Sequence, residues 1–195
     1  MKRIAIVFHS AHGHTRHIAG EVAAGARSVP HTLVRLFTAE EAAADPGPLT
    51  AFDGLLLGTP TYLGGVSSPF KAFMDATGRM WRQQSLRGKL AAGFTVSSLP
   101  SGDKQTTLVS LFTFAMQHGM QWVGNPVLPE QHQGVPEAEA ANRLGSWSGL
   151  MAQSAHGGPA DAFVPGDLKS ARLFGSHFAR TLQRVCAIDE PAVLS

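Results

Sequence analysis

The chain has 195 residues, of which 44% are hydrophobic and 15% are charged, and its formal net charge is +2. This balance excludes a disordered chain, and no apolar run approaches the ~20 residues that a membrane-spanning helix needs. Lysine and arginine are scattered singly and form no blocks, so the positive charge does not indicate nucleic-acid binding. The length predicts one domain over residues 1–195.

Two features of the sequence predict the cellular compartment of the protein. The apolar run after Met1-Lys2-Arg3 ends at Phe8, which is too short for a signal peptide. Cys186 is the single cysteine, so an internal disulfide is excluded and a reducing compartment is favoured. We therefore expect a cytoplasmic protein.

Five apolar stretches predict β-strands. Residues 3–9, 52–58 and 90–96 are strong candidates, and residues 31–37 and 121–128 are weaker ones. The strong stretches are continuously apolar, which is typical of parallel strands that are covered on both faces.

Helices are predicted between these strands, over residues 15–27, 68–81, 106–118 and 166–187, with a shorter helix and a loop between the second strand and Phe52. Ser68 is the expected N-cap of the second helix, followed by Pro69 at the first helical position. The apolar face of that helix is expected to comprise Phe70, Phe73, Met74, Thr77 and Trp81. The third helix is expected to bury Leu108, Leu111, Phe112, Ala115 and Met116.

Alternating strands and helices predict an α/β fold, a doubly wound parallel sheet of five strands in the order 2-1-3-4-5. Its ligand crevice lies beyond the carboxyl ends of the first, third and fourth strands. Residues 10–15, 59–68 and 97–104 should therefore meet there. Residues 129–165 are long, polar and rich in Gly, Ala and Pro, which predicts a functional loop.

The stretch SAHGHT, residues 10–15, follows a strand and opens a helix. Ser10 and Thr15 supply hydroxyls, Gly13 permits a tight turn, and the N–H groups of a helix N-terminus favour an anion. This chemistry fits a phosphate monoester. The loop matches neither the Walker A nor the GxGxxG pattern, so nucleoside triphosphates and dinucleotides lose their main support.

Two other interpretations of this stretch remain open. His9, His12, His14 and His17 could supply nitrogen ligands to a metal, but their spacing fits no common zinc pattern and no cysteine is near, so we expect no metal. The stretch could also be a polar loop with incidental histidines.

Several motifs in chain order resemble the WrbA family of FMN-dependent NAD(P)H:quinone oxidoreductases, which have a flavodoxin-like fold. They are Ser10, Gly13 and His14 after the first strand, Gly58-Thr59-Pro60-Thr61 after the third, Phe73, Asp75, Thr77, Gly78 and Trp81 in the next helix, Gln105-Thr106 and His118-Gly119-Met120 around the fourth helix, and Ala171, Arg172 and Gly175 in the last helix. Each motif is modest alone, but together they span nearly the whole chain.

The resemblance implies a role for each matching position. The FMN phosphate would be held by Ser10, His12, Gly13, His14 and Thr15. The isoalloxazine would be lined by Pro60, Thr61, Tyr62, Leu63 and the adjacent Gly64, by Ser97, Ser98, Leu99, Pro100 and Ser101, and by His118, which in the family often approaches from a neighbouring subunit. Trp81, with Tyr62, would form the pocket where nicotinamide and quinone bind in turn. The family is typically tetrameric.

This chain departs from the family at three places. The family usually has a tyrosine where His12 stands, an arginine where Tyr62 stands, and a Gly/Thr-rich loop where this chain has SSLPSG, residues 97–102. Pro100 in that loop cannot donate a backbone hydrogen bond.

The sequence favours an enzyme in which NADH or NADPH reduces FMN and the flavin passes two electrons to a quinone-like small molecule. No side chain need act as a general acid or base, because the flavin carries the chemistry. A flavodoxin-type electron carrier is one alternative, although such carriers usually have an acidic face. A flavodoxin-like binding module without turnover is another. At single positions, Trp81 could instead belong to the core, and His118 could instead cap its helix.

Overall fold

The computed structural model describes residues 1–188, and its centre is a twisted, mainly parallel sheet. The strands are β1 (Lys2–Phe8), β2 (Thr32–Thr38), β3 (Gly54–Tyr62), β4 (Gly65–Val66), β5 (Leu90–Ser97), β6 (Gln121–Trp122) and β7 (Leu150–Gln153). The order is β2-β1-β3-β5-β6, and β7 also pairs with β5. When the short strand β4, which pairs only with β3, is left out of the numbering, this is the predicted order 2-1-3-4-5, which is confirmed.

The fifth position of the sheet differs from the prediction because two strands share it. β6 pairs in parallel with the start of β5 at Leu90 and Ala91, and β7 pairs in parallel with its end, from Phe94 to Ser97. The expected single strand over residues 121–128 is wrong after Trp122. The expected loop over residues 129–165 contains β7 and the short 3-10 helix Glu130–Gln133. β4 is a further departure, since it pairs antiparallel with the end of β3.

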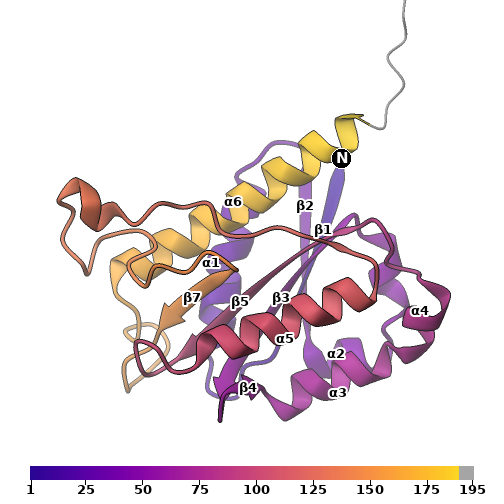
Figure 1. The fold of residues 1–195 in the computed structure, drawn as a ribbon, viewed down its shortest axis with the longest axis horizontal. Coiled ribbons are helices and arrows are strands. Elements are labelled where there is room, and N and C mark those ends of the chain that lie inside the picture. The colour runs from indigo at the N-terminus through magenta and orange to yellow at the C-terminus, as the bar shows by residue number, and fades with distance from the viewer. Residues whose placement is uncertain (189–195) are drawn as a thin grey trace, which may run out of the picture.

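The helices cover both faces of the sheet (Figure 1). They are α1 (His14–Arg27), α2 (Ala39–Ala44), α3 (Ser68–Ala76), α4 (Gly78–Gln83), α5 (Lys104–Gln117) and α6 (Pro165–Ile188), and the 3-10 helix Gly47–Ala51 precedes β3. α1 and α6 pack side by side on one face, and α2, α3 and α5 pack on the other.

The start and the length of the predicted helix 68–81 both need correction. Ser67, not Ser68, is its N-cap, and the helix ends at Ala76 before α4 begins. The Thr77 hydroxyl donates to the Met74 carbonyl at 2.7 Å, which closes the last turn of α3. Ser67 makes no capping hydrogen bond, and its hydroxyl lies 2.8 Å from His9 Nδ1 instead.

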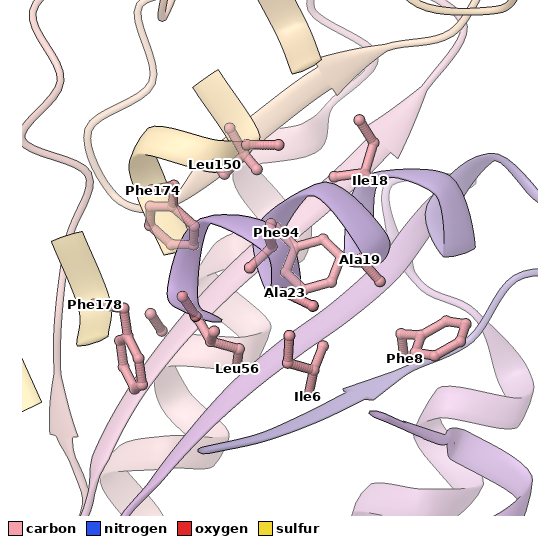
Figure 2. Packing of buried hydrophobic residues seen from close by; sticks show 14 of the residues in the cluster. Ile6, Phe8, Ile18, Ala19, Ala23, Leu56, Phe94, Leu150, Phe174 and Phe178 are labelled. Carbon is pink, nitrogen blue, oxygen red and sulfur yellow. The ribbon is translucent and has the colours of Figure 1, made fainter. Parts of the chain in front are cut away.

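Two hydrophobic cores result from this layering, one on each face of the sheet. Figure 2 shows the first, in which Phe94 and Leu56 of the sheet pack under Ala23 of α1 and Phe174 of α6. Successive side chains of a strand point into the two cores in turn, which explains why the strands are continuously apolar in the sequence.

The helix pair α1–α6 depends on two glycines. A Cβ atom on Gly175 would lie 2.0 Å from the Val22 carbonyl oxygen, and a Cβ atom on Gly25 would lie 1.9 Å from the Arg172 carbonyl oxygen. The Arg172 guanidinium also pairs with Glu21 across the same contact. The Ala171-Arg172 and Gly175 motif is therefore a packing motif.

We expect Gly175→Ala to destabilise the fold by about 3 kcal/mol, because the new methyl group meets backbone that can move only with its helix. Urea unfolding followed by circular dichroism measures this change. Gly20→Ala in α1 is the matched control: no atom lies within 4 Å of the new Cβ, so the helix should gain up to about 1 kcal/mol. Equal stability of the two variants would contradict the close helix contact.

Candidate functional site

The loop after β1 leaves its backbone N–H groups available to a ligand. Gly13 has φ 88° and precedes α1, which has neither a side-chain cap nor an acidic residue in its first turn. Within residues 1–188, no hydrogen bond uses the backbone N–H groups of residues 11–15, while Arg16 N–H donates to Ser10 Oγ at 3.1 Å. An uncapped helix N-terminus with free donors suits an anion.

These donors border a cavity of about 290 Å³ at the carboxyl ends of the parallel strands. Four segments line it, three of which the sequence predicted to meet. The lining residues are Ser10, Ala11, His12, His14 and Thr15 after β1, Pro60, Thr61 and Tyr62 at the end of β3, Val96, Ser97 and Ser98 at the end of β5, and Ser154, Ala155, His156 and Gly157 after β7.

The fourth segment, residues 154–163, closes over the loop after β1 and belongs to the polar stretch 129–165 that the sequence predicted to be functional. The His14 Nε2–H group donates to the Gly157 carbonyl at 3.1 Å, and Pro159 sits against Gly13. The ring of His17 stacks on Phe163 with centroids 5.7 Å apart. These residues are more than 140 positions apart in sequence, so only the unusual length of the polar segment signalled a role for it.

The four histidines of the first loop do not converge. His9 faces Ser67 and Glu40, with its Nε2 atom 3.6 Å from Glu40 Oε1, whereas His14 and His17 contact the segment 154–163. Among the described residues, no three His, Cys, Asp or Glu side chains are grouped closely enough to hold a metal ion.

At the end of β3, backbone and side chains are fixed by a hydroxyl cluster. Thr61 Oγ1 lies 2.8 Å from both Thr95 Oγ1 and Thr107 Oγ1, beneath the cavity. Tyr62 lines the cavity and is 45% exposed. Leu63 and Gly64, both with positive φ, form the tight turn to β4, and neither lines the cavity.

The loop after β5 meets the cavity only through its first residues. Ser97 and Ser98 line the cavity, while Pro100 and Ser101 border a different surface depression and Leu99 is exposed. The sequence did not single out Lys104, which is fully buried beneath this loop at the start of α5. A buried lysine carries no signal in a local pattern, because its partners here are two backbone carbonyls and a serine hydroxyl.

Trp81 and His118 lie together in a second cavity, of about 470 Å³, which shares no lining residue with the first. Within one chain, Trp81 therefore does not flank the same cavity as Tyr62, as we expected it to. His118 likewise does not lie beside the residues expected to line the isoalloxazine. Trp81 is 49% exposed, so the alternative that it belongs to the core is wrong. Phe112 and Met116 of α5, expected in the core, are also exposed.

His118 is the C-cap residue of α5, but its ring bonds elsewhere. Its Nε2 atom lies 2.9 Å from Thr77 Oγ1, and its Nδ1 atom is buried without a hydrogen-bond partner within the described structure. Burial lowers the pKa of His118, so the imidazole is neutral at neutral pH.

Comparison with known proteins gives consistent matches. Residues 47–133 match the family model described as NADPH-dependent FMN reductase. Flavodoxin FldP from Pseudomonas aeruginosa is 35% identical over 96% of this chain and all of its own length. An NAD(P)H dehydrogenase (quinone) from Archaeoglobus fulgidus is 32% identical over 95% of this chain and all of its own length.

A solved structure agrees with these relatives. The flavodoxin, WrbA-like protein from Agrobacterium tumefaciens superposes with a TM-score of 0.71 at 32% identity, covering 94% of this chain and 99% of its own.

Proposed function

Because the chain belongs to the WrbA-type family of FMN-binding oxidoreductases, we propose that it transfers electrons from NADH or NADPH to quinone-like acceptors by two-electron reduction, with FMN as cofactor. The observation that carries this proposal is the set of free N–H groups at residues 11–15, which opens into a cavity at the carboxyl ends of β1, β3 and β5.

The residues around the cavity fit FMN. The N–H groups of the loop after β1, with the Ser10 and Thr15 hydroxyls, would hold the phosphate. Pro60, Thr61 and Tyr62 on one side and Ser97 and Ser98 on the other would line the isoalloxazine. Leu63, Gly64, Leu99, Pro100 and Ser101 would contribute through loop shape.

The chemistry of the cavity agrees with a cofactor that carries the reaction. When bound, FMN supplies hydride acceptance and two-electron donation. Of the residues that the structure describes, none that lines the cavity is an Asp or Glu. The side chains there bind and orient the partners, and the segment 154–163 shields the phosphate end from water.

We further propose that the protein is a homotetramer, and that it works in the cytoplasm. Val109, Phe112 and Met116 form an exposed apolar stripe on α5, which a second copy of the chain would cover. In this arrangement Trp81 and His118 complete the flavin site of a neighbour, which explains why they lie apart from the cavity of their own chain.

An electron carrier remains the second candidate, because the 35% identical relative is named a flavodoxin. Such carriers meet partner proteins through an acidic face, and the net charge of +2 argues against one here.

Fluorescence titration tests the cofactor. FMN should quench on binding at micromolar concentration, and FAD should bind no more tightly, since the cavity has a single phosphate loop and the sequence no dinucleotide motif. No quenching by either flavin would overturn the proposal.

Trp81→Ala should raise the KM for benzoquinone about fivefold, because an aromatic wall contributes roughly 1 kcal/mol by stacking. The FMN Kd and the melting temperature should change little, since Trp81 is half exposed. Steady-state kinetics and thermal unfolding measure these effects. Trp147→Ala is the matched control, a similarly exposed tryptophan that lines neither of the two cavities. An unchanged KM in Trp81→Ala would remove Trp81 from the site.

A further inference from the structure

Lys104 is the centre of the loop after β5. It is the first residue of α5, and its side chain is fully buried. Its ammonium donates to Ser97 Oγ at 2.9 Å, to the Leu99 carbonyl at 2.7 Å and to the Pro100 carbonyl at 3.0 Å. All three donors are used, so the loop is folded around one cation.

A second cation fixes the neighbouring carbonyl of the same loop. Arg143 binds Asp167 through two nitrogens, at 2.8 and 3.1 Å, and donates to Gln153 Oε1 at 3.1 Å. Gln153 in turn donates to the Ser98 carbonyl at 3.2 Å. Three consecutive carbonyls, at residues 98–100, are therefore occupied by donors from the protein.

As a result, the loop offers a ligand backbone hydrogen-bond donors and few free hydrogen-bond acceptors. Within the described structure, no hydrogen bond uses the backbone N–H groups of Ser98, Leu99, Ser101 or Gly102, and of these residues Ser98 lines the cavity. An unoccupied N–H group favours a ligand atom that is negative or becomes negative.

The charge behind this part of the cavity is positive. Among the described residues, Asp167 is the one buried carboxylate near Lys104, and it is shared with Arg143; Glu137, which also pairs with Arg143, and Asp103 are exposed. Burial lowers the pKa of Lys104 to about 8; Asp167 opposes this shift and Arg143 adds to it. Lys104 is therefore mostly protonated at pH 7, and it loses its charge as the pH rises through 8.

We propose that Lys104 is a positioning residue that sets the shape of the loop after β5 and places a positive charge behind Ser97, so that the site binds reduced FMN more tightly than oxidised FMN. This inference rests on the proposed function. Transfer of a hydride from NAD(P)H leaves NAD(P)⁺ and adds one negative charge to the ring. A cation directly behind the cavity wall stabilises that charge.

Lys104→Met, which keeps the length of the side chain and removes the charge, tests the proposal. The ratio of affinities for reduced and oxidised FMN should fall about tenfold, which lowers the two-electron midpoint potential by about 30 mV. Spectroelectrochemistry on the FMN-loaded protein measures the potential, and fluorescence titration measures the Kd for oxidised FMN.

Lys89→Met is the matched control. Lys89 is partly buried and also donates to two backbone carbonyls, those of Thr50 and Phe52, but it lies just before the opposite end of β5. Its loss should reduce stability and leave the potential unchanged. If Lys104→Met also loses stability without any change in potential, the role of Lys104 is structural and the proposal is overturned.

A measurement on the unmodified protein covers the case in which Lys104→Met does not fold. The ratio of affinities for reduced and oxidised FMN should decline between pH 7 and 9.5 in both the unmodified protein and Lys89→Met. Both proteins retain Lys104, which loses its proton over this pH range. Lys104→Gln, which retains a donor but no charge, should show no such decline. A ratio that is independent of pH in the unmodified protein would contradict the proposal. Failure of the unmodified protein to bind FMN would instead contradict the proposed function.

Discussion

Replacing Gly13 with valine should raise the FMN Kd at least about 100-fold. Gly13 has φ 88°, a conformation that a β-branched residue adopts only with strain. A Cβ atom there would also lie 2.6 Å from Pro159 Cγ. The variant therefore both distorts the phosphate loop and displaces the segment 154–163 that covers it. Fluorescence titration with FMN measures the Kd.

The control for backbone strain is Gly88→Val. Gly88 also has a positive φ, of 78°, but no atom lies within 4 Å of the new Cβ. It precedes β5, at the end of the sheet opposite the cavity. Gly88→Val should lose comparable stability and bind FMN normally. If Gly13→Val still binds FMN at micromolar concentration, the loop after β1 does not hold the phosphate.

The double variant Val109→Glu, Met116→Glu should be monomeric, should keep its FMN and should lose most of its quinone reductase activity. Both side chains lie on the exposed apolar stripe of α5, and four carboxylates per pair of touching stripes would make contact between copies unfavourable. The monomer would lack the Trp81 and His118 of its neighbour. Light scattering gives the mass, and the flavin spectrum gives the FMN content.

Leu33→Glu provides the comparison for this double variant. Leu33 is an equally exposed apolar residue, but it lies on the edge strand β2. Its substitution should leave the oligomer and the activity unchanged. An unmodified protein that is monomeric with FMN bound would contradict the proposed tetramer and favour an electron carrier.

The sequence predicted those parts of the fold that depend on local pattern. The apolar runs of β1, β3 and β5 are long enough to be identified as buried parallel strands, and their alternation with helices fixed the sheet order. The same order brought the loops after β1, β3 and β5 to one cavity. The anion-binding loop before α1 could be predicted because Ser10, Gly13 and Thr15 lie within one six-residue stretch.

The remaining features depend on contacts between distant residues. β7 has four residues, too few for a periodic signal, and it forms only because β5 offers it an unpaired edge. Phe112 and Met116 fit a helical apolar face in sequence, but in the structure they lie on the outward side of α5. Likewise, Lys104 is buried among carbonyls that the sequence cannot place. Exposed apolar residues and buried charges are the positions at which local patterns fail, and here both lie at proposed sites of function.

The most direct test is NAD(P)H oxidation by the FMN-loaded protein with benzoquinone as the sole electron acceptor and no partner protein present. We expect sustained turnover in which one NADH or NADPH is oxidised for each quinone reduced by two electrons, at a rate that depends on bound FMN. A protein that binds FMN but oxidises neither nicotinamide under these conditions would contradict the proposed oxidoreductase.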